Sequence, residues 1–118
     1  MTGRIALTSG EPAGIGPDLI LSAAVREWDA ALVALGDRAL FEARASQLGL
    51  SVELLPYTSG ESALPHERGK LPFIELPLSV PCEAGVLAPE NASYVLAQLD
   101  LASVLCESGE CAAMVTAP

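Results

Sequence analysis

Short apolar runs alternate with helix-forming segments along the chain, and this order constrains the fold more than any other feature of the sequence. The apolar runs that we predict as strands span residues 5–7, 31–35, 52–55, 73–76 and 112–116. The patterns between them predict helices over residues 17–26, 38–48 and 89–108. Consecutive parallel strands need a crossover connection, which a helix usually supplies. We therefore expect an α/β fold, a mostly parallel sheet with flanking helices.

Residues 56–72 interrupt this alternation with prolines and glycines among scattered polar residues, which predicts a long surface loop. The helix at 89–108 should expose one polar stripe and bury the opposite face. The residues predicted to be exposed are Ser93, Asp100, Ser103 and Glu107, and those predicted to be buried are Val95, Leu99, Ala102 and Cys106. Residues 19–25 are apolar on almost every side, so we expect them to be largely covered.

Residues 8–18 read Thr-Ser-Gly-Glu-Pro-Ala-Gly-Ile-Gly-Pro-Asp, which predicts a strand end, a glycine-rich turn and a helix start. Such a turn can present backbone N–H groups to an anion. The segment is not a dinucleotide fingerprint, because Leu19 stands where the third glycine belongs. It is not a P-loop either, because Ile15 follows the four spacers after Gly10 and no lysine is present.

Glu11 limits what this turn could bind, since its carboxylate would repel a bound phosphate. Glu11 could accept from a ribose, an amide or an amine, or it could fix the loop by accepting from backbone N–H groups. The simplest structural interpretation is a tight connection in which Gly14 and Gly16 supply backbone freedom. Thr116 is the last residue of a predicted strand, at the sheet edge where α/β proteins place ligands. Both interpretations stay open at this point.

The nine residues from Gly10 to Asp18 resemble the N-terminal signature of the 4-hydroxythreonine-4-phosphate dehydrogenase family. Residues 26–28, 84–91 and 114–118 are similar to the same family, in the same order. The resemblance implies a fold similar to the isocitrate and isopropylmalate dehydrogenases, incomplete here, and a homodimer that builds its site across the subunit interface. Residues 1–118 would be the N-terminal α/β part of a longer two-domain enzyme.

The resemblance also implies a reaction. A phosphorylated amino acid, 4-phosphohydroxy-L-threonine, would be oxidised with NAD(P) and a divalent metal (zinc, magnesium or cobalt). Decarboxylation would then give 3-amino-2-oxopropyl phosphate, in pyridoxal phosphate (vitamin B6) biosynthesis. The residues expected beside the cofactor and substrate are Gly10, Glu11, Pro12, Gly14, Ile15, Gly16, Pro17 and Thr116.

The family's metal-binding histidines and its substrate-binding lysine, asparagine and arginine have no matching positions in this sequence. We therefore expect no catalytic residue and no metal ligand in this chain, and no activity from the 118 residues alone. One alternative is a related dehydrogenase of another phosphorylated four-carbon acid, such as phosphothreonate. Another is a small non-catalytic α/β binding module.

Several further side chains have an ordinary structural interpretation. The single histidine, His66, is expected to be a solvated loop residue, and Trp28 to pack against the first helix. Cys106 and Cys111 are expected to be core thiols, because a structural zinc site wants four ligands. Glu90 and Asn91 should stabilise the start of the last helix.

The charge of the chain excludes some classes of partner. Six lysines and arginines face 15 aspartates and glutamates, a formal net charge of −9, so we expect neither nucleic acid nor a membrane as a partner. No apolar stretch is long enough to span a bilayer. Three cysteines without framework spacing favour the reducing cytoplasm.

Overall fold

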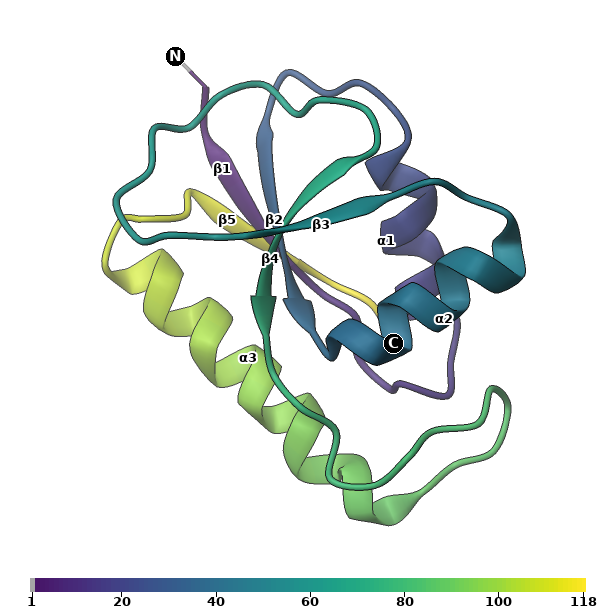
Figure 1. Cartoon of the computed structure of the whole chain (residues 1–118). Helices are drawn as coiled ribbons and strands as arrows, with labels where there is room; N and C mark the ends of the chain where they lie inside the picture. The colour runs from purple at the N-terminus through teal and green to yellow at the C-terminus, as the bar shows by residue number, and fades with distance from the viewer. Residues whose placement is uncertain (1) are drawn as a thin grey trace.

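The computed structural model describes residues 2–118, which form one five-stranded parallel sheet with helices on both faces (Figure 1). The strands are β1 (Arg4–Thr8), β2 (Ala31–Gly36), β3 (Glu53–Pro56), β4 (Lys70–Glu75) and β5 (Ala113–Thr116), in the order β3-β4-β2-β1-β5. Every pairing is parallel, so all five carboxyl ends lie at one edge of the sheet. The predicted fold class is confirmed.

The helices divide between the two faces of the sheet. They are α1 (Gly16–Ala24), α2 (Arg38–Leu48) and α3 (Ala92–Glu107), which is preceded by a single 3-10 turn, η1 (Pro89–Asn91). One core cluster joins α1 and α2 to the sheet through Leu21 and Phe41, both fully buried. A second cluster joins α3 to the other face through Ala102 and Leu105. The two faces are visible in Figure 1, with α3 opposite α1 and α2.

Several boundaries of the predicted elements differ from the structure by one to three residues, and α3 begins at Ala92 rather than at residue 89. Strand β4 begins at Lys70, three residues before the predicted start, so the surface loop covers 57–69 rather than 56–72. Pro72 falls inside β4, in register with Leu55, although a proline gives the ladder no N–H. Pairing with both β2 and β3 holds the strand extended through this proline. Helix α2 has the predicted bounds.

The buried faces of two helices also differ from the prediction. Helix α3 buries Tyr94, Gln98, Ala102 and Leu105 rather than the predicted stripe, of which only Ala102 is buried. In α1, Leu19 is 52% exposed, because the helix packs against α2 and the core through the side that carries Ile20, Leu21 and Ala24. Hydrophobicity alone does not define the buried side of either helix. Within residues 2–118, no helix combines the length and the apolar character that a membrane crossing requires.

Candidate functional site

The loop from Ser9 to Ile15 connects β1 to α1 at the carboxyl edge of the sheet. Gly10 has a φ of 68°, and a Cβ atom there would overlap the carbonyl oxygen of Ala117. A Cβ atom on Gly16 would overlap the carbonyl oxygen of Ser9. The backbone freedom predicted for Gly14 and Gly16 is not used, since neither has a positive φ; glycine is required at position 16 by this close approach instead. At Gly14 a Cβ atom would lie 3.3 Å from the carbonyl oxygen of Glu11, a closer contact than usual but not an overlap.

Most backbone N–H groups of this loop already have acceptors within the protein. The N–H groups of Ser9 and Gly10 donate to the Gln98 Oε1 atom, at 2.7 and 3.3 Å. The N–H of Glu11 donates to the carbonyl of Pro118 at 3.1 Å. The Glu11 carboxylate accepts from the N–H of Ala13 at 3.1 Å, so it fixes the loop, as one of our two interpretations expected. A loop with these donors occupied is not an open phosphate cradle.

Arg44 holds the loop from the side of α2. Its Nη2 atom donates to the carbonyl of Pro12 at 2.7 Å, and its Nη1 atom donates to the carbonyl of Gly14 at 3.0 Å. The same Nη1 atom pairs with the Asp18 carboxylate at 2.9 Å. The Arg44 side chain is only 6% exposed, so water does not compete for these donors.

Gln98 holds the loop from the opposite face of the sheet. Besides the two backbone N–H groups, its Oε1 atom accepts from the Ser9 hydroxyl at 3.2 Å. Its Nε2 atom donates to the carbonyl of Gly10 at 3.4 Å. Sequence reasoning missed both Arg44 and Gln98. The one signal in the sequence was that each is a polar residue with hydrophobic residues four positions before and after it in a predicted helix.

The end of β5 lies beside this loop. Thr116 is in register with Thr8, and the N–H of Ala117 donates to the Thr8 carbonyl at 3.0 Å. A largely apolar pocket of about 230 Å³ lies between α1 and this end of β5, lined by Leu19, Val115 and Thr116 among others. The structure therefore brings Thr116 and the glycine-rich loop together at one edge. Ile15 and Thr116 are exposed there, whereas Pro12, Gly16 and Pro17 are buried.

A second segment that carries the resemblance, residues 84–91, also meets this loop. The N–H of Gly85 donates to the carbonyl of Ala13 at 2.9 Å. The Asn91 side chain accepts from the N–H groups of Ser79 and Val80, at 2.9 and 3.1 Å. Asn91 makes no side-chain hydrogen bond to the start of α3, so the predicted stabilisation of the helix start by this side chain is not seen, whereas Glu90 does lie in the first turn. The side chain instead fixes the segment that approaches the glycine-rich loop.

His66 lies at the opposite, amino-terminal end of the sheet, and its predicted exposure is wrong. It is 6% exposed, and its Nε2 atom lies 2.8 Å from the carbonyl of Ala24. Its Nδ1 atom is buried and has no hydrogen-bond partner within residues 2–118.

Trp28 donates from Nε1 to the carbonyl of Ala23 at 2.9 Å, which confirms its predicted place against the first helix.

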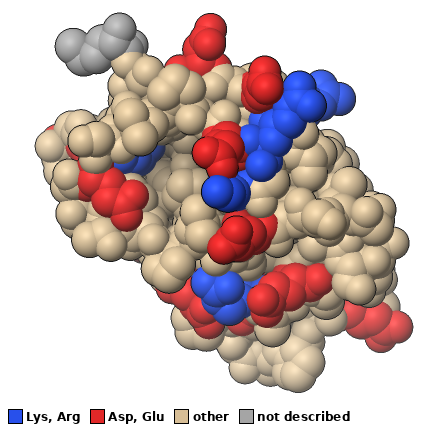
Figure 2. All heavy atoms as spheres, turned by 45° about the horizontal axis from the view of Figure 1, so that its top comes forward, with Lys and Arg blue, Asp and Glu red and all other residues tan. Residues whose placement is uncertain are grey.

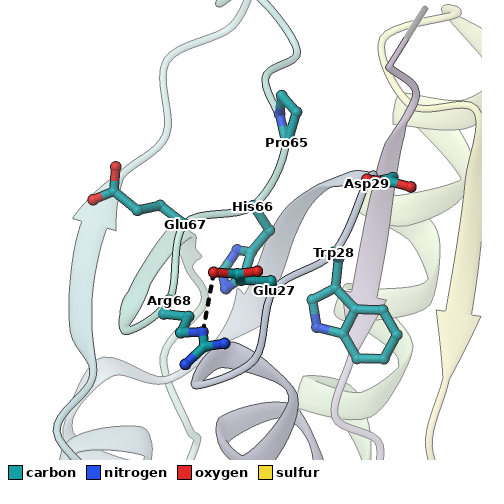
Figure 3. A pocket seen from close by; sticks show the side chains of 7 residues that line it. All are labelled: Glu27, Trp28, Asp29, Pro65, His66, Glu67 and Arg68. Atoms are coloured by element: carbon teal, nitrogen blue, oxygen red, sulfur yellow. Dashed lines mark ion pairs between the residues drawn. The ribbon is translucent and has the colours of Figure 1, made fainter.

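An open pocket of about 770 Å³ surrounds this histidine (Figure 3). Its charged residues are Glu27, Asp29, Glu67 and Arg68, with Arg68 paired to Glu27 at 3.4 Å. This pair is mostly exposed and therefore weak. In the described part of the chain, no group of three His, Cys, Asp or Glu side chains could hold a metal ion.

The thiols are buried or half-buried rather than activated. Cys111 is 2% exposed in the core beneath α3, and Cys106 packs against the same cluster. Burial raises the pKa of the Cys111 thiol and that of the Cys82 thiol, so both stay protonated near neutral pH. The core position predicted for Cys111 is confirmed.

Acidic and basic side chains lie next to one another on the face shown in Figure 2. Exposed ion pairs include Lys70 with Glu67 at 2.8 Å and Arg38 with Glu75 at 3.5 Å. The cations in these pairs are therefore already neutralised by neighbouring carboxylates.

Comparison with known proteins identifies the family. The model of the family described as "Pyridoxal phosphate biosynthetic protein PdxA" matches residues 27–118. The chain belongs to this family. It is 46% identical to a 4-hydroxythreonine-4-phosphate dehydrogenase of Pseudoalteromonas translucida (strain TAC 125), over 100% of this chain and 36% of the relative. It is 49% identical to the enzyme of the same name from Chromobacterium violaceum, over 97% of this chain and 34% of that relative.

Solved structures of the PdxA family share the fold. A putative 4-hydroxythreonine-4-phosphate dehydrogenase from Salmonella typhimurium superimposes with a TM-score of 0.84 at 28% identity, over 99% of this chain and 38% of that one. The enzyme from Burkholderia phymatum gives a TM-score of 0.87 at 21% identity, over 100% of this chain and 37% of that one. The chain spans about a third of the length of these relatives.

Proposed function

We propose that this chain is the N-terminal α/β part of a 4-hydroxythreonine-4-phosphate dehydrogenase in pyridoxal phosphate biosynthesis. The full-length enzyme would be a cytoplasmic homodimer that takes NAD(P), a divalent metal (zinc, magnesium or cobalt) and a phosphorylated amino acid. One observation carries the proposal: the segments that resemble the family, 10–18, 84–91 and 114–118, are far apart in sequence and converge at the carboxyl edge of the sheet. In open α/β folds this edge is where ligands bind.

The residues of this chain would form part of the wall of the reactant site and would not include its catalytic residues. The backbone from Ser9 to Gly16 is fixed on its inner side, while Ile15 and Thr116 remain exposed at the edge. These exposed residues would form one wall beside the reactants. The described residues do not fit a divalent metal ion, since no three of their His, Cys, Asp and Glu side chains lie close enough together to bind one. No step of the reaction is therefore assigned to a metal held by this chain.

The test compares two proteins, the 118-residue chain and an enzyme of the relatives' length that contains it. Reduction of NAD(P) is followed with 4-phosphohydroxy-L-threonine and each of the three metals. We expect turnover by the long protein only, with release of carbon dioxide. Turnover by the short chain would contradict the proposed division of roles.

The same assay separates the alternatives. A long protein that oxidises phosphothreonate and ignores 4-phosphohydroxy-L-threonine would be a related dehydrogenase with another substrate. A long protein that oxidises neither compound with any of the metals would favour a non-catalytic module.

A further inference from the structure

Two buried polar side chains, from helices on opposite faces of the sheet, converge on the same short loop. Arg44 of α2 is 5% exposed and Gln98 of α3 is fully buried. Each makes its hydrogen bonds to the backbone between Ser9 and Gly14, with additional contacts from Arg44 to Asp18 and from Gln98 to the Ser9 hydroxyl. Burying polar groups carries a free-energy cost unless they are hydrogen-bonded, and these two are bonded almost entirely to this loop.

The contacts of Arg44 depend on the shape of its guanidinium group. Two different nitrogen atoms reach the carbonyls of Pro12 and Gly14, at 2.7 and 3.0 Å. Those two carbonyls lie on either side of Ala13, so a single planar group fixes the direction of both peptide units. A lysine offers one compact ammonium and cannot span both acceptors in this way.

The contacts of Gln98 fix the other end of the loop. One oxygen accepts from the successive N–H groups of Ser9 and Gly10, at 2.7 and 3.3 Å. The other residues buried on this side of α3 are Tyr94, Ala102 and Leu105, so the amide stands in a mostly apolar surface. A leucine would fill similar space there but would leave both N–H groups without an acceptor.

We infer that Arg44 and Gln98 are positioning residues of the reactant site. They hold the backbone of Ser9 to Gly16 from both faces of the sheet, so that Ile15 and the adjoining end of β5 keep a fixed place beside the reactants. Neither side chain touches a reactant itself. This inference rests on the proposed function, because it assigns a role in the same site.

The test uses the enzyme of the relatives' length with the variants R44Q, R44K, Q98L and Q98E. Displacing a site wall by about 1 Å can cost on the order of 100-fold in rate, so we expect kcat to fall roughly 10- to 100-fold in R44Q and Q98L. R44K should not restore kcat, whereas Q98E should restore part of it, since a carboxylate still accepts from both N–H groups. The value of kcat is expressed per folded molecule, which removes any loss due to stability alone.

Two matched controls and one structural readout complete the design. R38Q removes a half-exposed guanidinium from the same helix α2, and S103A changes an exposed side chain of α3; both should keep kcat within about twofold. Hydrogen exchange of the peptide 9–16 should become faster in R44Q and Q98L than in the controls. If R44Q does not fold, R44K takes its place, since its kcat is also expected to fall; if Q98L does not fold, the Arg44 variants decide the inference.

The outcomes for the two proposals are distinct. Unchanged kcat per folded molecule in R44Q and Q98L would overturn the inference while leaving the proposed function intact. Absence of turnover in the unsubstituted enzyme would refute the proposed function. In that case, exchange of the peptide 9–16 at the unsubstituted rate in both variants would overturn the inference as well.

Discussion

The carbonyl oxygen of Ser9 occupies the space in which a side chain on Gly16 would begin. Substituting alanine at Gly16 would therefore force two backbone segments apart, and neither can swing aside as a flexible side chain could. We expect Gly16→Ala to lower the free energy of unfolding by about 1–3 kcal/mol or more, because the strain falls on the backbone. Urea unfolding followed by circular dichroism measures the change.

Gly14→Ala is the matched control for this substitution. It makes the same chemical change in the same loop, but its nearest contact is at 3.3 Å and φ is not positive. Its effect should stay within about 1 kcal/mol. Equal losses in the two variants would show that the loop tolerates neither methyl group, and that the close approach to Ser9 is not the cause.

We expect the buried phenol of Tyr94 to lower the free energy of unfolding at alkaline pH. Tyr94 is 2% exposed, and burial raises its pKa above the ordinary value of 10.0. The unfolded chain therefore releases this proton at a lower pH than the folded chain, so stability is complete below about pH 10 and falls as the pH rises toward the folded pKa. The raised pKa values of Cys82 and Cys111 act in the same direction, from their ordinary value of 9.0 upward.

Tyr94→Phe tests the contribution of this residue. The Tyr94 hydroxyl accepts from the N–H of Asp37 at 2.9 Å, so its removal should cost about 1 kcal/mol at pH 7. The free energy of unfolding should decline less steeply above pH 10 in this variant. The decline caused by ionisation of Cys82 and Cys111 should remain. An unchanged alkaline slope would refute the assignment to Tyr94.

The buried imidazole of His66 anchors the loop 57–69 to the end of α1. Replacing it with alanine removes the contact to the carbonyl of Ala24 and leaves a cavity, with an expected loss of about 1–3 kcal/mol. The loop should then open more often, so trypsin should cleave after Arg68 faster than in the unsubstituted chain. His66→Gln serves as the control, since its amide nitrogen can still donate to Ala24. Cleavage of H66Q as fast as H66A would argue against the hydrogen bond.

Arg4 holds the same loop from the sheet. It donates to the carbonyls of Glu61 and Glu110, at 2.8 and 3.2 Å, and its guanidinium lies 4.9 Å from the centre of the Tyr57 ring. We expect Arg4→Met to lower the free energy of unfolding by about 1–3 kcal/mol, since a buried guanidinium loses two partly buried contacts to carbonyl groups. Differential scanning calorimetry would show the change as a lower Tm.

Arg68→Met removes the same charge at an exposed position, so it controls for net charge. Its ion pair with Glu27 is mostly solvated and should contribute at most about 1 kcal/mol. The Tm of R68M should therefore stay near that of the unsubstituted chain. A larger loss in R68M than in R4M would reverse the proposed order of the two arginines.

The sequence alone predicted the architecture because its signals are local. Alternating apolar runs and helical patterns predicted the five strands and the three α-helices of residues 2–118, and α2 has the predicted bounds, 38–48. The glycine-rich segment was recognised because its residues are consecutive. Boundary errors arose where pairing overrode a local preference, as at Pro72, which stays in a strand that has partners on both sides.

The sequence by itself thus determined the parallel α/β class, the position of the Gly10–Gly16 turn and the resemblance to one enzyme family. Only the tertiary structure decided which side chains hold that turn, and that His66 is buried. Arg44 and Gln98 meet the turn across separations of 32 and 89 residues. A residue's neighbours along the chain do not determine such contacts. They depend on which helix face the sheet covers, and that is decided when distant apolar residues bury one another.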